Sequence, residues 1–163
     1  MFQLKPISKS GIPEALAKAE RYRLLNEPRL TESICLDILE IEPDHHDAIV
    51  IMLLSLTDQF GKTVSANVRE ARQLLPKLNQ YEQYYYGGLI CERQAKASLK
   101  DLGGGNFTAY EWLRDAMSLY EKAEAIRPAD NDDSILRWNT CVRLILRNNL
   151  QPRKEEYVEP AVD

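Results

Sequence analysis

The chain has 163 residues, a net charge of −4, 44% hydrophobic residues and 28% charged residues. These values are typical of one globular domain with its own core, and they exclude general disorder and a disulfide-rich scaffold. Acidic and basic residues are interspersed, which argues against a dedicated nucleic-acid binder, because such proteins usually concentrate basic residues on one face. No apolar run has the length of an export signal or a membrane span, so we expect a soluble cytoplasmic protein without membrane contacts.

Most glycines and prolines fall between segments of helical periodicity, so these breaks outline helices. The first predicted helix begins beside Pro13, carries Ala19 and Tyr22 on one face, and ends at Glu27-Pro28. It ends there because a residue that precedes proline avoids the α conformation.

The second predicted helix carries Ile34 to Ile41 and ends at Pro43. Asp44 follows this proline and precedes a third predicted helix, which runs from about Ala48 to Phe60-Gly61. Nearly all faces of this third helix are apolar, so it should lie at the centre of the fold.

The fourth predicted helix spans roughly residues 66–78 and contains Pro76, which should kink or shorten it. The fifth covers about residues 80–99. The sixth starts after the loop KDLGGGNF, where Thr108 and Glu111 match a T-x-x-E capping box.

The seventh predicted helix is capped by Asn131 or Asp132 and ends at Asn148-Asn149. No alternating strand pattern of any length competes with these segments. The sequence therefore predicts an all-α protein.

Two segments, TESICLDILEIEPDHHD and DAMSLYEKAEAIRPADND, share one pattern of small residues, apolar residues and a closing proline. The aligned pairs are Thr31 with Ala116, Cys35 with Tyr120, Ile38 with Ala123, Ile41 with Ile126, and Pro43 with Pro128. A further helix begins after each proline, so the repeating unit is a helical hairpin.

This pattern resembles the tetratricopeptide repeat family, in which small residues lie where helices cross closely and a proline ends the second helix. The resemblance is best at Ala116, Tyr120, Ala123 and Pro128, and YYYGGLICER resembles the first helix of another unit, with Gly88 at the small position. It implies a right-handed α-α superhelix of about three hairpins over residues 1–149, closed by a last helix that covers the exposed end. The stretches GKTVSANV and LGGGNFTAYEW depart from the family's spacing.

The resemblance also implies that the first helix of each hairpin lines a concave groove. The corresponding positions are Leu16, Glu20, Arg23, Asp47, Val50, Leu54, Asp58, Glu82, Tyr85, Leu89, Arg93, Ile135, Asn139 and Arg143. Tyr85 and Arg93 are the expected anchors, because aromatic and arginine residues dominate many interfaces. The lysine and asparagine with which some members hold a terminal carboxylate are replaced here by Leu16, Glu20 and Ile51, so that clamp is not expected.

The residues offer no catalytic, metal or cofactor site. His45 and His46 are the only histidines and have no third ligand nearby, and the glycines at 103–105 lack the spacing of a phosphate-binding loop. The widely spaced Cys35, Cys91 and Cys141 predict reduced, mostly buried thiols. We therefore expect a non-enzymatic chain without cofactors.

Partner binding is the function that this pattern favours: a protein-interaction module or scaffold that takes a peptide or helix of another protein. The alternatives are a helical-repeat RNA-binding protein and a self-associating assembly factor. The tail, residues 150–163, should be extended or disordered, because Pro152 and Pro160 interrupt helix and apolar content is low. Its Tyr157 and Val158 among acidic residues also suit docking onto its own domain or a second copy, which would give a homo-oligomer.

Overall fold

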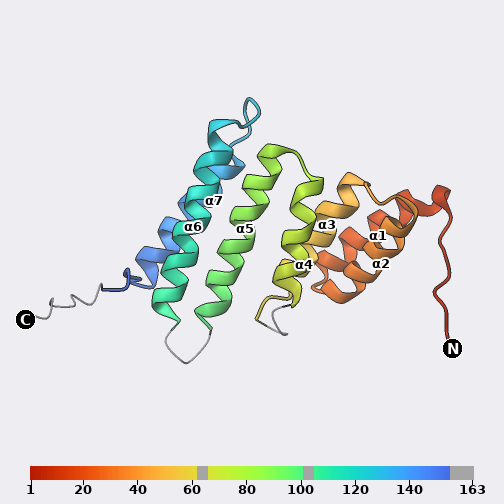
Figure 1. The fold of residues 1–163 in the computed structure, drawn as a ribbon, viewed down its shortest axis with the longest axis horizontal. Helices are drawn as coiled ribbons and strands as arrows, with labels where there is room; N and C mark the ends of the chain where they lie inside the picture. The colour runs from red at the N-terminus through yellow and green to blue at the C-terminus, as the bar shows by residue number, and fades with distance from the viewer. Residues whose placement is uncertain (62–65, 101–104, 155–163) are drawn as a thin grey trace, which may run out of the picture.

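The structure of the protein, a computed structural model, describes residues 1–61, 66–100 and 105–154 (Figure 1). Within these ranges it contains seven α-helices and no β-strand, so the prediction of an all-α protein is confirmed. The helices are α1 (Ile12–Leu24), α2 (Pro28–Ile41), α3 (His46–Thr57), α4 (Ala66–Leu74), α5 (Gln80–Ser98), α6 (Asn106–Ala125) and α7 (Asp133–Arg147). Two short 3-10 turns, Lys9–Gly11 and Leu75–Lys77, precede α1 and follow α4.

Helices that follow one another in sequence lie side by side, and the row runs from α1 and α2 at one end to α6 and α7 at the other (Figure 1). α1 packs on α2, α2 on α3, α3 on α4, α5 on α6, and α6 on α7. The contact between α4 and α5 is much less extensive than that between α5 and α6.

Three apolar clusters hold the row together, and the two larger ones meet near α5. The first joins α1 to α4 and also receives Leu78 and Ile90. The second joins α5, α6 and α7, with Leu113, Tyr120 and Cys141 among its fully buried members. α3 is buried over most of its length, which confirms its predicted central place.

Close helix crossings occur where the sequence supplies small residues. A Cβ atom on Gly88 of α5 would lie 2.6 Å from Cε1 of Tyr120 on α6, so the tyrosine ring rests directly on the glycine backbone. Ala116 and Ala123 of α6 are both fully buried. The predicted small position at Gly88 is therefore a real point of close approach.

Several helix ends differ from the prediction. The N-cap of α3 is His45, whose side chain accepts a hydrogen bond from the Ala48 amide. α6 begins at Asn106, so Thr108 already lies inside the helix and the predicted capping box is wrong. Gly105, which directly precedes α6, lies very close to α5. A Cβ atom on Gly105 would lie 2.1 Å from the carbonyl oxygen of Ser98.

The predicted effect of Pro76 is confirmed, because α4 ends at Leu74 and continues only as a 3-10 turn. Asn79 then caps α5 through a capping box with Glu82 that the sequence reading missed. α1 ends where Asn26 adopts a left-handed conformation, with φ of 60°, which Asn tolerates better than most residues.

The packed part of the chain extends to Leu150, which is 2% exposed and belongs to the second apolar cluster. The predictions for the glycine-rich loop at 101–104 and for the tail from residue 155 onward lie outside the described residues. In the described part of the chain, none of the helices combines the length and the apolar character needed to cross a bilayer.

The three cysteines are free and buried, as predicted. Burial raises the pKa of Cys35 and of Cys141 to about 12, and that of Cys91 to about 11. Each thiol therefore stays protonated near neutral pH, which makes it a poor nucleophile and metal ligand.

Candidate functional site

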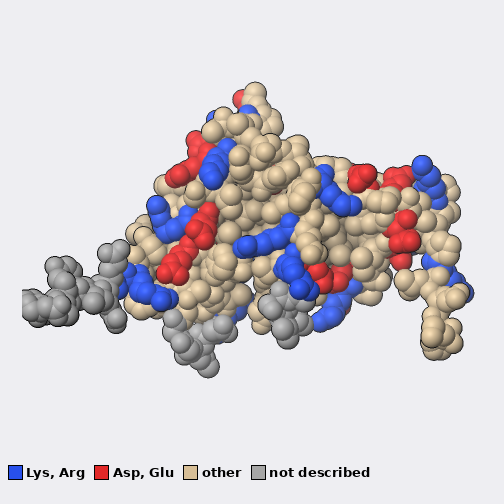
Figure 2. Space-filling view, viewed as in Figure 1, with Lys and Arg blue, Asp and Glu red and all other residues tan. Residues whose placement is uncertain are grey.

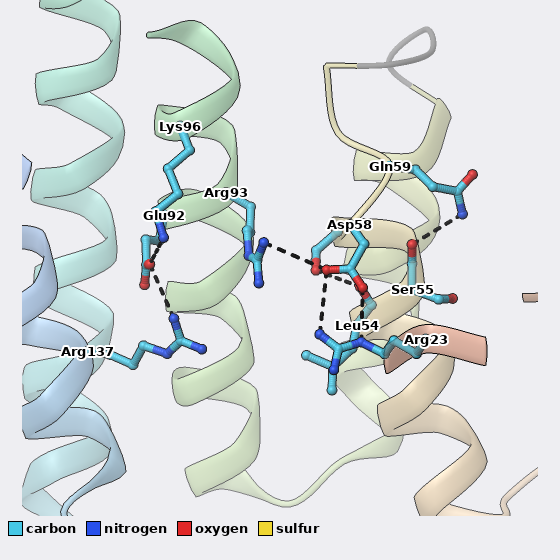
Figure 3. Close-up of polar contacts among 10 residues, drawn as sticks. Arg23, Leu54, Ser55, Asp58, Gln59, Glu92, Arg93, Lys96 and Arg137 are labelled. Atoms are coloured by element: carbon cyan, nitrogen blue, oxygen red, sulfur yellow. Dashed lines mark hydrogen bonds and ion pairs between the residues drawn. The ribbon is translucent and has the colours of Figure 1, made fainter. Parts of the chain in front are cut away.

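A carboxylate at the end of α3 joins three helices. Asp58 follows the last residue of α3, and its Oδ2 lies 3.0 Å from Nε of Arg23 on α1. Its Oδ1 lies 3.7 Å from Nη1 of Arg93 on α5, so one carboxylate is shared by two guanidinium groups (Figure 3). The sequence analysis placed all three residues on one groove, and the structure brings them together.

A second carboxylate joins α5 to α7 on the other side of α5 (Figure 3). The Glu92 side chain is fully buried, and its Oε1 lies 2.6 Å from Nζ of Lys96 and 3.3 Å from Nη1 of Arg137. The Tyr120 hydroxyl donates a 2.8 Å hydrogen bond to Oε2. Burial and the negative charge of Glu92 raise the pKa of Tyr120, which keeps this donor protonated.

A third polar contact links the N-terminal ends of α3 and α5. Nε2 of His46 lies 2.6 Å from Oε1 of Glu82, and Nδ1 lies 3.0 Å from Oδ1 of Asp47. The hydrogen bond to Asp47, followed by that to Glu82, raises the pKa of His46 above its usual value. Together the three contacts connect α1, α3, α5 and α7, which alternate along the row of helices.

These four helices also line one pocket of about 720 Å³, which we call the basic pocket. Its walls come from the C-terminal ends of α1, α3, α5 and α7 and from the residues that follow them. The lining residues are Arg23, Leu24, Asn26, Thr57, Asp58, Phe60, Arg93, Lys96, Ala97, Leu99, Lys100, Leu144, Arg147 and Asn148.

The lining of the basic pocket is cationic and partly apolar. It contains five basic residues and a single carboxylate, that of Asp58. Phe60, Leu99 and Leu144 provide apolar surface between these charges. A ligand that combines negative charge with apolar groups would be complementary to this surface.

The other predicted groove residues are distributed along the same helices. Glu82 and Asp47 lie at the opposite end, around His46. Partly buried positions are Leu16, Val50, Leu54, Tyr85, Ile135 and Asn139, and exposed positions are Glu20 and Arg143. None of these lines the basic pocket.

Leu89 requires a correction, because it is only 1% exposed and belongs to the protein interior. A partner cannot contact a side chain at this position without unpacking α5. Tyr85 is also engaged internally: its ring stacks on Tyr81 and packs against Tyr86 and Tyr120. Arg93 thus remains the predicted anchor that reaches the pocket.

Of the residues that line the basic pocket, the sequence analysis named only Arg23, Asp58 and Arg93. Those that it missed include Lys96, Lys100, Leu144 and Arg147. Helical spacing could have found the two lysines, because they continue the face of Arg93 in steps of three and four residues. Leu144 and Arg147 lie one to four residues beyond the predicted Arg143, so the site on α7 is closer to the helix end than the family pattern implies.

A second pocket, of about 610 Å³, lies between α4, α5 and α6. The guanidinium of Arg72 stands over the Trp112 ring at its edge, 5.6 Å from the ring centroid. Cys91 also lines this pocket, and its raised pKa keeps the thiol protonated, so it is a poor nucleophile. Within residues 1–61, 66–100 and 105–154, no three His, Cys, Asp or Glu side chains are grouped so that they could hold a metal ion.

Comparison with known proteins gives no assignment: no family model, curated protein or solved structure matches the chain significantly. The site must therefore be interpreted from its own geometry. Figure 2 shows that acidic and basic side chains are interspersed over the face turned to the viewer, where blue patches alternate with red ones.

Proposed function

We propose that this chain is a non-enzymatic protein-interaction module of the tetratricopeptide type, which binds a peptide or helix of a partner protein in the basic pocket. The observation that carries the proposal is the origin of the pocket walls: α1, α3, α5 and α7 all contribute side chains. A concave surface built from the first helix of each unit is what a stack of hairpins would present to a ligand.

The dimensions of the pocket suit a short segment of a partner. Its volume of about 720 Å³ lies within the usual range of ligand pockets, roughly 300–1,000 Å³. A folded domain could not enter it, whereas a few residues of an extended or helical segment could. The bridges from Asp58 to Arg23 and Arg93 hold the walls in place before binding, which lowers the cost of ordering side chains.

The test compares two double variants of the full chain as bait in extracts of the source cells. Arg93→Ala with Arg147→Ala removes two cations from the pocket, and the control, Arg29→Ala with Arg114→Ala, removes two exposed cations outside it. We expect the pocket variant to lose the proteins that the wild type retains, while the control keeps them. Circular dichroism must show equal helicity for all three proteins.

Equal retention by both double variants would place the partner surface elsewhere. Two alternatives give distinct results in the same experiment. Retention of RNA that declines steeply with added salt would favour the helical-repeat RNA-binding protein. Retention of nothing but a second copy of the chain would favour the self-associating assembly factor.

A further inference from the structure

The charge of the basic pocket opposes that of the whole protein. The chain has 21 Lys and Arg against 25 Asp and Glu, whereas the pocket lining has five cations and one carboxylate. If Glu92, which is buried beneath Lys96, is also counted, the local balance is 5 − 2 = +3. An acidic protein has therefore concentrated positive charge at one concave site.

Two of these cations have no internal partner. Asp58 is shared between Arg23 and Arg93, and Glu92 contacts Lys96. Lys100 and Arg147 make no ion pair with any described residue. Both are exposed, so they can take a new counter-charge without breaking an existing contact.

Helix dipoles explain only part of this arrangement. Arg23, Lys96 and Arg147 lie in the last turns of α1, α5 and α7, where a cation offsets the helix dipole. Lys100 lies beyond the C-cap of α5, and Arg93 lies more than a turn before the end of that helix.

From this charge, and resting on the proposed function, we infer that the partner segment is an acidic peptide in which carboxylate side chains alternate with apolar ones. Carboxylates pair with Lys100 and Arg147, and the apolar side chains contact Phe60, Leu99 and Leu144. Guanidinium and ammonium groups bind carboxylates through charge-assisted hydrogen bonds, and the apolar surface adds burial.

Nucleic acid fits the same pocket less well. Proteins that bind single strands combine a continuous basic groove with several aromatic rings on which bases stack. Phe60 is the single aromatic residue among the lining side chains. The face that Figure 2 shows offers no continuous basic band along which a strand could extend. An acidic peptide needs only the local charge that the pocket supplies.

The test measures fluorescence anisotropy of a labelled peptide of alternating Glu and Leu, compared with its Gln and Leu counterpart. The proteins are the full wild-type chain, Lys100→Glu with Arg147→Glu, and the control Arg29→Glu with Arg114→Glu. Both double variants carry the same net charge, so long-range repulsion is matched and only the position of the change differs. Two lost pairs of roughly 0.7 kcal/mol each predict about a tenfold weaker affinity for the pocket variant.

The expected result at low salt is a clear preference of the wild type for the Glu peptide, lost in the pocket variant and kept in the control. Equal affinity for the two peptides, or equal weakening by both double variants, overturns the inference. Tighter binding of a uridine oligonucleotide than of the Glu peptide also overturns the inference. So does a tenfold gain in peptide affinity when residues 155–163 are removed, because that result would assign the pocket to the chain's own terminus. If the cell-extract experiment succeeds while the peptide preference is absent, the proposed function stands and only the acidic ligand is wrong.

Discussion

Replacing Gly88 by alanine tests the closest helix crossing in the fold. The new Cβ atom would lie 2.6, 2.8 and 3.0 Å from three ring atoms of Tyr120, well inside ordinary contact distance. The ring cannot easily move away, because Tyr120 is fully buried and its hydroxyl donates to Glu92 at 2.8 Å. Overpacking of this kind costs about 1–3 kcal/mol, which exceeds the gain of roughly 1 kcal/mol in helix propensity from glycine to alanine.

Gly87→Ala is the matched control on the same helix. Its nearest neighbour would be Cδ1 of Leu119 at 3.5 Å, an ordinary contact, so this variant should gain stability from helix propensity alone. Urea denaturation should therefore separate the two variants by about 2 kcal/mol, or by roughly 4–8 °C in melting temperature for a chain of this size. Equal stability of the two variants would refute the packing of α5 on α6 described above.

Three further variants test other contacts. Ala123→Leu should lower the free energy of unfolding by about 1–3 kcal/mol, since this position is fully buried, whereas exposed Ala125→Leu should change it by less than about 0.5 kcal/mol. Glu92→Ala leaves two cations and a buried hydroxyl without their acceptor, so urea denaturation should show a loss of about 3 kcal/mol. The pKa of His46 is raised in the folded protein. Its contribution to the free energy of unfolding is therefore complete below the pKa of the unfolded chain, and it disappears as pH rises through the pKa of the folded protein. The stability difference between wild type and His46→Gln should thus be larger near pH 6 than near pH 8.5, and a constant difference would contradict the contact with Glu82.

Helix positions were readable from the sequence because glycine and proline punctuate strong apolar periodicity. Helix ends were less readable, because several residues near each end can cap. Asp44 and His45 are both able to accept a backbone hydrogen bond, and the structure uses His45. The T-x-x-E pattern at Thr108 has the right chemistry, yet the tight approach of Gly105 to Ser98 starts α6 earlier.

The candidate site was partly predictable for the same reason. Arg23, Asp58 and Arg93 each follow from the repeat register, and the structure joins them. Leu89 follows from the same register but is buried, because the apolar clusters on both sides of α5 enclose this part of the helix. Lys96 and Lys100 continue the face of Arg93 by helical spacing. Their meeting with Arg147 depends on how the ends of α1, α5 and α7 converge, which no local pattern encodes.

Site-specific photo-crosslinking tests the proposed function most directly. A benzophenone amino acid replaces Lys100 in the basic pocket or, as a control, exposed Leu36 on α2, and each full-length protein is irradiated in extracts of the source cells. The proposal predicts one discrete protein partner that crosslinks from Lys100 and not from Leu36. Crosslinks of equal strength from both positions, or crosslinks to nucleic acid alone, would contradict it.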